Sequence, residues 1–150
     1  MLKTSMAVLL AASSAANAVD APLRIRSIEA HLYLQHSGSL SPPIQSETAL
    51  WNTIIGEGDS GEPSNSMLID VILEGRPGSF DARPEVSLVV SNLTSGKTKV
   101  RLTSHVGVLS KAGVFHAAFW LNDTGCEPLK FVATIGHDTA RKDVPFACGE

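Results

Sequence analysis

The stretch Met67–Leu73, which reads Met-Leu-Ile-Asp-Val-Ile-Leu, decides how this chain is expected to fold. It follows a long loop rich in Gly, Ser and Pro, and the turn sequence Gly-Arg-Pro-Gly comes soon after it. A short apolar run between turn signals is typical of a buried strand. We therefore expect a central strand here. One face of this strand would carry Met67, Ile69, Val71 and Leu73.

Segments on both sides of this stretch alternate apolar with polar residues, as a half-buried strand requires. They cover residues 28–35, 86–92, 97–109, 114–121, 129–135 and 144–148. Leu23 and Ile25 are out of phase with the first segment, which predicts a β-bulge or a switch between sheets around Arg26 and Ser27. The short apolar patch Leu50–Ile55 suits either an edge strand or a helical turn.

These segments are short, evenly spaced and separated by turn residues, and no long amphipathic helix accompanies them. The pattern predicts an all-β fold, an antiparallel β-sandwich of immunoglobulin-like type with 7–8 strands. A β-barrel is the alternative. Segments 86–92 and 97–109 are expected to form one hairpin, and the last two segments another. The Cys-Trp-Cys spacing of antibody domains is absent.

The two cysteines flank the C-terminal hairpin. Cys126 lies 11 residues before His137, where the chain is expected to turn, and Cys148 lies 11 residues after it. A symmetric antiparallel hairpin would place them opposite each other, at a separation that a disulfide can span. An even number of cysteines in an exported chain also favours a disulfide. We expect a structural Cys126–Cys148 bond.

The N-terminus has the pattern of a secretory signal peptide. Lys3 supplies a positive charge, an apolar run follows, and Ala16-Asn17-Ala18 fits the signal peptidase site. We expect residues 1–18 to be cleaved and 19–150 to form a single β-sandwich domain in the periplasm or outside the cell. No other segment is long and apolar enough to span a membrane. With 12 Lys and Arg against 15 Asp and Glu, nucleic acid is a poor partner.

The loop 56–66 and the residue segment before it hold the main candidate binding residues. Glu57, Asp59 and Glu62 lie close together, and carboxylates in a loop can bind calcium. Trp51, just before this loop, would either pack on the core or stand exposed at a recognition surface. His105 and His116 are placed to meet across a hairpin that turns near Lys111. Two imidazoles are too few to close a zinc site, so a metal stays unassigned and no cofactor is expected.

Within this loop, Gly58–Pro63 resembles the Gly-Asp-Ser-Gly-Gly-Pro nucleophile motif of chymotrypsin-like serine proteases, and departs from it at Glu62. The resemblance covers six residues. That family places His and Asp upstream of the Ser in a longer, two-barrel chain, whereas only a short mature segment precedes Ser60. A small hydrolase is therefore the least favoured of three functions.

The favoured function is a non-catalytic binding or interaction module of the cell envelope or extracellular space. It would recognise a protein partner through loops or an edge strand. The alternative is a secreted protein that binds a small ligand or calcium through the acidic loop 56–66. The oligomeric state and the identity of any partner do not follow from the sequence.

Overall fold

The computed structural model describes residues 22–47, 49–81 and 83–147. The expected signal peptide, residues 1–18, lies outside them. Ten strands are present: β1 (Arg24–Leu34), β2 (Ser39–Leu40), β3 (Leu50–Trp51), β4 (Met67–Glu74), β5 (Glu85–Asn92), β6 (Thr98–His105), β7 (Val114–Leu121), β8 (Leu129–Ile135), β9 (Asp138–Val144) and β10 (Phe146–Ala147).

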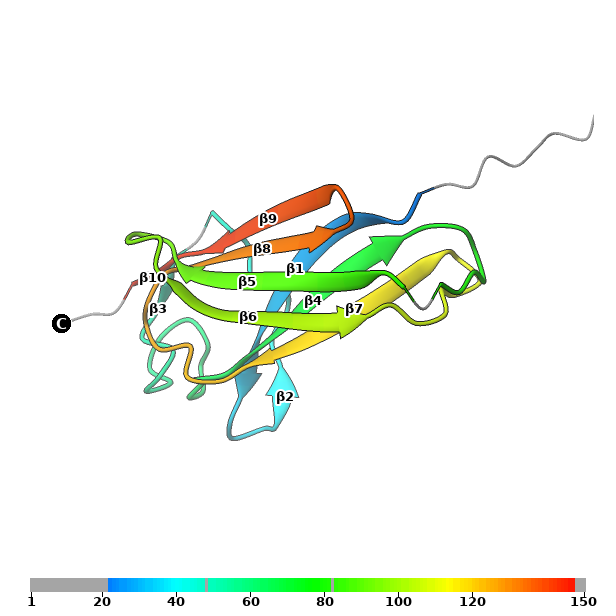
Figure 1. Cartoon of the computed structure of the whole chain (residues 1–150). Coiled ribbons are helices and arrows are strands. Elements are labelled where there is room, and N and C mark those ends of the chain that lie inside the picture. The colour runs from blue at the N-terminus through cyan, green and yellow to red at the C-terminus, as the bar shows by residue number, and fades with distance from the viewer. Residues whose placement is uncertain (1–21, 48, 82, 148–150) are drawn as a thin grey trace, which may run out of the picture.

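Two four-stranded antiparallel sheets make up the sandwich (Figure 1). The first has the order β2-β1-β4-β7, and the second has the order β6-β5-β8-β9. The strands β3 and β10 pair in parallel to form a third, two-stranded sheet. Seven strands have seven or more residues, and the other three have two each. The predicted all-β sandwich with 7–8 strands is confirmed.

The order of the seven long strands is close to that of immunoglobulin domains. The first, second and fifth long strands, β1, β4 and β7, share one sheet, and the third, sixth and seventh, β5, β8 and β9, share the other. Immunoglobulin constant domains divide their strands in the same way. One difference concerns the fourth long strand, β6, which here lies beside the third instead of the fifth.

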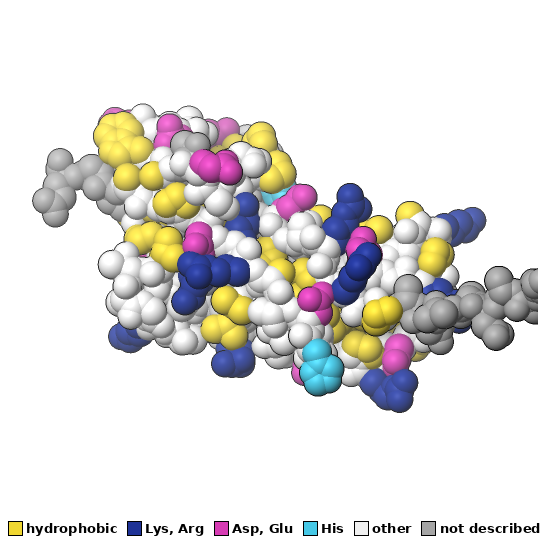
Figure 2. Space-filling view, turned by 90° about the horizontal axis from the view of Figure 1, so that it is seen from above, with side chains coloured by type: hydrophobic (Ala, Val, Ile, Leu, Met, Phe, Trp, Pro, Cys, Tyr) yellow, Lys and Arg dark blue, Asp and Glu magenta, His cyan; other side chains and the backbone are white. Residues whose placement is uncertain are grey.

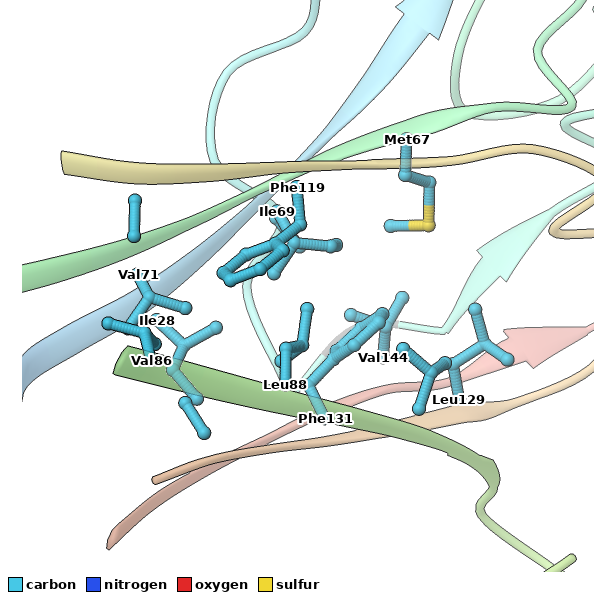
Figure 3. Packing of buried hydrophobic residues seen from close by; sticks show 14 of the residues in the cluster. Ile28, Met67, Ile69, Val71, Val86, Leu88, Phe119, Leu129, Phe131 and Val144 are labelled. Atoms are coloured by element: carbon cyan, nitrogen blue, oxygen red, sulfur yellow. The ribbon is translucent and has the colours of Figure 1, made fainter. Parts of the chain in front are cut away.

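The central strand is β4, as the stretch Met67–Leu73 predicts. It lies between β1 and β7, and its inward side chains Met67, Ile69, Val71 and Leu73 are fully buried. They face Leu88 and Phe131 of the second sheet across the core (Figure 3). Burying apolar side chains from both sheets is the main stabilising contribution to such a sandwich.

The β-bulge predicted around Arg26 and Ser27 is present. Ile25 pairs with Leu73 and Ser27 with Ile72, so Arg26 is the extra residue. The bulge changes the phase of β1, which explains why Leu23 and Ile25 are out of step with the rest of the strand.

Both predicted hairpins are also present. The strands β5 and β6 are paired, and so are β8 and β9, where Ile135 opposes Asp138 across the turn Gly136-His137. This turn is centred half a residue before His137, and Leu129 opposes Val144. Cys148 lies outside the described residues, so the Cys126–Cys148 disulfide stays a prediction.

One local expectation needs correction, and one open alternative is decided in part. The strand expected over 97–109 ends at His105, because the chain then crosses from the second sheet to the first, and Leu109 N donates to Ser79 O at 2.9 Å. Of the two alternatives for Leu50–Ile55, the edge strand is right for its first two residues, which form β3, after which Asn52 turns the chain with a φ of 46°. Within the described residues, no helix is long and apolar enough to cross a membrane.

Candidate functional site

Trp51 stands at the surface, with 46% of its area exposed, so the interpretation that it packs on the core is wrong. The Trp51 backbone forms two hydrogen bonds with Asp59, one as donor and one as acceptor. Trp51 N donates to Asp59 Oδ2 at 2.8 Å, and Asp59 N donates to Trp51 O at 3.2 Å. The Asp59 carboxylate therefore fixes the shape of its own loop.

Glu62 performs a similar structural role at another loop. Its Oε2 accepts hydrogen bonds from Ser37 N at 2.9 Å and from His36 N at 3.1 Å, in the turn between β1 and β2. The Ser37 N–H is the main reason that the pKa of Glu62 lies below its ordinary value, with a smaller contribution from His36. Glu57 is exposed and forms no hydrogen bond to another described residue.

We expect the stability contributed by Glu62 to depend on pH. Because folding lowers the pKa of this carboxyl, its contribution is complete above the ordinary pKa and is lost as the pH falls through the folded pKa. The melting temperature of wild type should exceed that of Glu62→Gln at neutral pH, and this difference should shrink below pH 4.5. Glu57→Gln is the control, because Glu57 forms no hydrogen bond to another described residue, and its melting temperature at neutral pH should stay close to that of wild type. A difference between wild type and Glu62→Gln that stays constant with pH would contradict this assignment.

The three acidic residues of the loop are not gathered around one point, since Asp59 and Glu62 bind backbone N–H groups in different places. No three or more His, Cys, Asp or Glu residues are grouped to hold a metal ion anywhere in the described part of the chain. The expected meeting of His105 and His116 is wrong. His105 opposes Glu85 in the second sheet, whereas His116 opposes Ile72 in the first.

Ser60, the residue at the nucleophile position of the protease-like motif, donates its hydroxyl hydrogen bond to Glu62 O at 2.6 Å. None of the described histidines is hydrogen-bonded to it. A general base would have to accept the proton of this hydroxyl. The arrangement is that of a loop-closing serine.

A hollow of about 770 Å³ lies where β1 begins, beside the turn between β8 and β9. Its charged side chains are already paired. Arg83 Nη2 binds Asp81 Oδ2 at 3.0 Å, Arg24 binds Glu74 at 2.7 Å, and Asp138 Oδ2 accepts a hydrogen bond from Ile25 N. The Arg83–Asp81 pair is local to one loop, Arg24–Glu74 joins two neighbouring strands, and the hydrogen bond from Ile25 to Asp138 links the two sheets.

The sheet edges differ strongly from one another. Over Ala30–Leu34, the outer edge of β1 is covered by β2 and by the following loop, from which Ser41 N donates to Leu32 O and Ile44 N donates to Ala30 O. The edge strand β6 carries Lys99 and Arg101. Charged residues at an edge discourage pairing with another strand, because their burial against a partner is costly.

The edge strand β9 is protected in the same way. It carries Arg141, Lys142 and Asp143, and Arg141 Nη2 binds Asp143 Oδ2 at 2.7 Å. Figure 2, which views the molecule from the side of β9 in Figure 1, shows basic and acidic side chains intermixed over this face.

The edge strand β7 has no such protection. Its sequence, Val-Phe-His-Ala-Ala-Phe-Trp-Leu, contains no Asp, Glu, Lys, Arg or Pro, and its eight residues pair with β4 without a register shift. It forms the border of the first sheet, with β4 on one side and no described strand on the other (Figure 1). A long, uncharged and unbroken edge is a template for pairing with another strand.

Hydrogen bonds at the start of β7 show which peptide groups point outward. Gly75 N donates to Gly113 O at 2.9 Å, toward β4, whereas Ser110 N donates to Val114 O on the other side. Alternate residues of an antiparallel strand point their N–H and C=O groups to the same side. His116, Ala118 and Trp120 therefore direct theirs away from β4. Among the described residues, no backbone group pairs with them there.

The side chains of these three residues lie on the outer face of the first sheet. His116 Nδ1 donates to Asp70 Oδ2 at 2.6 Å, and the Asp70 side chain is 18% exposed. Trp120 leans over the sheet and packs edge-to-face on Tyr33, with ring centroids 5.2 Å apart. Between them, the small side chain of Ala118 is exposed and leaves the middle of the edge open.

Sequence reasoning missed this site, although one signal was present. Like 86–92, the expected strand 114–121 lacks both charged residues and proline. Its position at a sheet edge could not be inferred, because strand sequence does not determine strand order.

The two antiparallel sheets and their strand order define the class: a β-sandwich of immunoglobulin-like fold. Among solved structures, an immunoglobulin-like protein from Pseudomonas aeruginosa is similar, with 12% sequence identity and a TM-score of 0.44, over 85% of this chain and 98% of that one. The assignment of fold rests on the strand order given above. No protein-family model and no curated protein matches the chain.

Proposed function

We propose that this chain is an exported, non-catalytic interaction module that recognises a protein partner by strand addition at the β7 edge. The observation that carries the proposal is the contrast among the four edges: β1 is covered, β6 and β9 are charged, and β7 is neither. Strand addition uses main-chain hydrogen bonds for affinity and alternate side chains for specificity.

The backbone of the edge supplies the affinity. The outward N–H and C=O groups of His116, Ala118 and Trp120 form a row of donors and acceptors for an extended segment. Pairing with such a segment satisfies these groups without any rearrangement of the sandwich.

The side chains beside this row supply the selectivity. On the outer face, an added strand would lie against His116 and the exposed Ala118, which leaves room for a large side chain. The hydrogen bond to Asp70 holds His116 in place. These neighbours favour an extended segment with β-branched or aromatic residues at every second position.

The location follows from the N-terminus. Residues 1–18 have the charge, apolar run and cleavage pattern of a secretory signal, which supports the proposal that the module works in the periplasm or outside the cell. In that setting an interaction module would act on envelope or extracellular proteins.

The test is selection of peptides from a displayed library of random extended sequences on immobilised residues 19–150. Selected peptides should alternate apolar with polar residues and should lose binding to Ala118→Pro, because proline removes the outward N–H donor. Ala118→Val keeps this N–H and should retain binding. Peptides that bind wild type and Ala118→Pro equally would place recognition elsewhere and overturn the proposal.

A further inference from the structure

We infer that the strand added at the β7 edge is the β7 strand of a second copy of this chain, so that the protein forms a two-fold symmetric dimer with a continuous eight-stranded sheet. This inference rests on the proposed function and names its partner. A two-fold axis brings the same surface of both copies together, so the edge must be complementary to itself.

The outward peptide groups determine the register of the pair. Val114 is excluded, because its O accepts from Ser110 N and its N donates to Ser110 Oγ at 3.1 Å. The three remaining outward residues, at positions 116, 118 and 120, are centred on Ala118. In an antiparallel pair Ala118 would oppose itself, and each directly opposed pair would exchange two hydrogen bonds.

The side chains in this register complement one another. On the outer face, His116 opposes Trp120 of the other copy, and the two Ala118 methyl groups meet at the axis. On the inner face, the small Ala117 opposes the large Phe119 of the other copy. Pairs of this kind, aromatic with aromatic or small with large, pack without excess volume.

Charge explains why a second copy fits at this edge and at no other described edge of the sandwich. About a two-fold axis only the residue on the axis opposes its own copy, so on β6 an axis at Val100 would set Lys99 against Arg101 of the other copy, and like charges directly opposite destabilise a pair. On β9, Arg141 would oppose Lys142 of the other copy about an axis between these two residues, and Lys142 would oppose itself about an axis one half-residue further on. The only titratable side chain of β7, His116, is already paired with Asp70.

The first experiment measures the mass of residues 19–150 in solution as a function of concentration, by light scattering after size exclusion. Wild type should change from monomer to dimer as the concentration rises. Ala118→Pro should remain monomeric at every concentration, with an unchanged melting curve at the lowest concentration, and Ala118→Val should still dimerise. A wild type that stays monomeric throughout, or that forms species larger than a dimer, would overturn the inference.

The second experiment tests the register. Directly opposed residues in a hydrogen-bonded pair lie within reach of a disulfide, so Ala118→Cys should give a covalent dimer under mild oxidation. Thr103→Cys, exposed on the charged edge strand β6, is the matched control and should remain monomeric. Equal cross-linking of both variants would contradict the inference. Failure here together with successful peptide selection would show strand addition with a different partner, so the two proposals can fail separately.

Discussion

Phe131→Ala is expected to lower the free energy of unfolding by about 3–5 kcal/mol, which is the range for removing a buried phenylalanine ring. Phe131 is the largest fully buried side chain of the described residues, and it lies on β8 facing the central strand β4 across the core. The loss combines the transfer free energy of the ring with the cavity it leaves. Domains of this kind have about 5–15 kcal/mol of stability in total. Chemical denaturation of residues 19–150 would measure the change.

Phe80→Ala is the matched control. The Phe80 side chain is 62% exposed, so its removal creates no cavity, and the change in unfolding free energy should stay within about 0.5 kcal/mol. Similar losses for the two variants would mean that the sandwich core is not packed as described.

Gly113→Ala is expected to destabilise the fold by roughly 2–4 kcal/mol, for two reasons that add together. The residue has a φ of +76°, a region that side chains rarely tolerate, and an added Cβ would lie 2.4 Å from the carbonyl oxygen of Gly75. That carbonyl belongs to the backbone, so the clash cannot be relieved by rotating a side chain. The substitution should separate the start of β7 from the end of β4, where Gly75 N donates to Gly113 O.

Gly136→Ala is the control that separates the cost of the positive φ from the cost of the clash. Gly136 also has a positive φ, of +56°, but an added Cβ there would meet no atom within 4 Å. Its cost should be only the backbone strain, about 1–2 kcal/mol. Thermal and denaturant unfolding of both variants would give the difference. Equal costs would show that the close approach of Gly113 to Gly75 contributes nothing.

The sequence predicts the strands of this protein better than their arrangement. Alternation located β4, β5, β7 and β8 because each buries one face on the core, and the phase change before Ile28 revealed the bulge at Arg26. The assignment of a hairpin partner to 114–121 failed because the connection after β6 crosses between sheets. Such a crossing leaves no periodic signal, since both strands still bury one face.

The acidic loop shows why site residues are harder to predict than strands. Glu57, Asp59 and Glu62 are neighbours in the sequence, which suggested a shared ligand. The fold directs Asp59 to the Trp51 backbone and Glu62 to the turn at Ser37. Carboxylates commonly bind nearby N–H groups in loops, and the sequence alone does not distinguish this role from metal binding.

The short strand β2, together with the loop after it, determines how large an assembly of this protein can become. In the language of polymer chemistry, a sheet with two reactive ends is a bifunctional monomer and grows into a chain, whereas a sheet with one reactive end can only couple once. Because Ser39–Leu40 and the groups from Ser41 to Ile44 pair with the Ala30–Leu34 part of β1, they block the far end of the first sheet there, and the β7 end is the reactive one. Coupling through β7 therefore terminates at two copies and consumes the edge on which a fibril would otherwise grow.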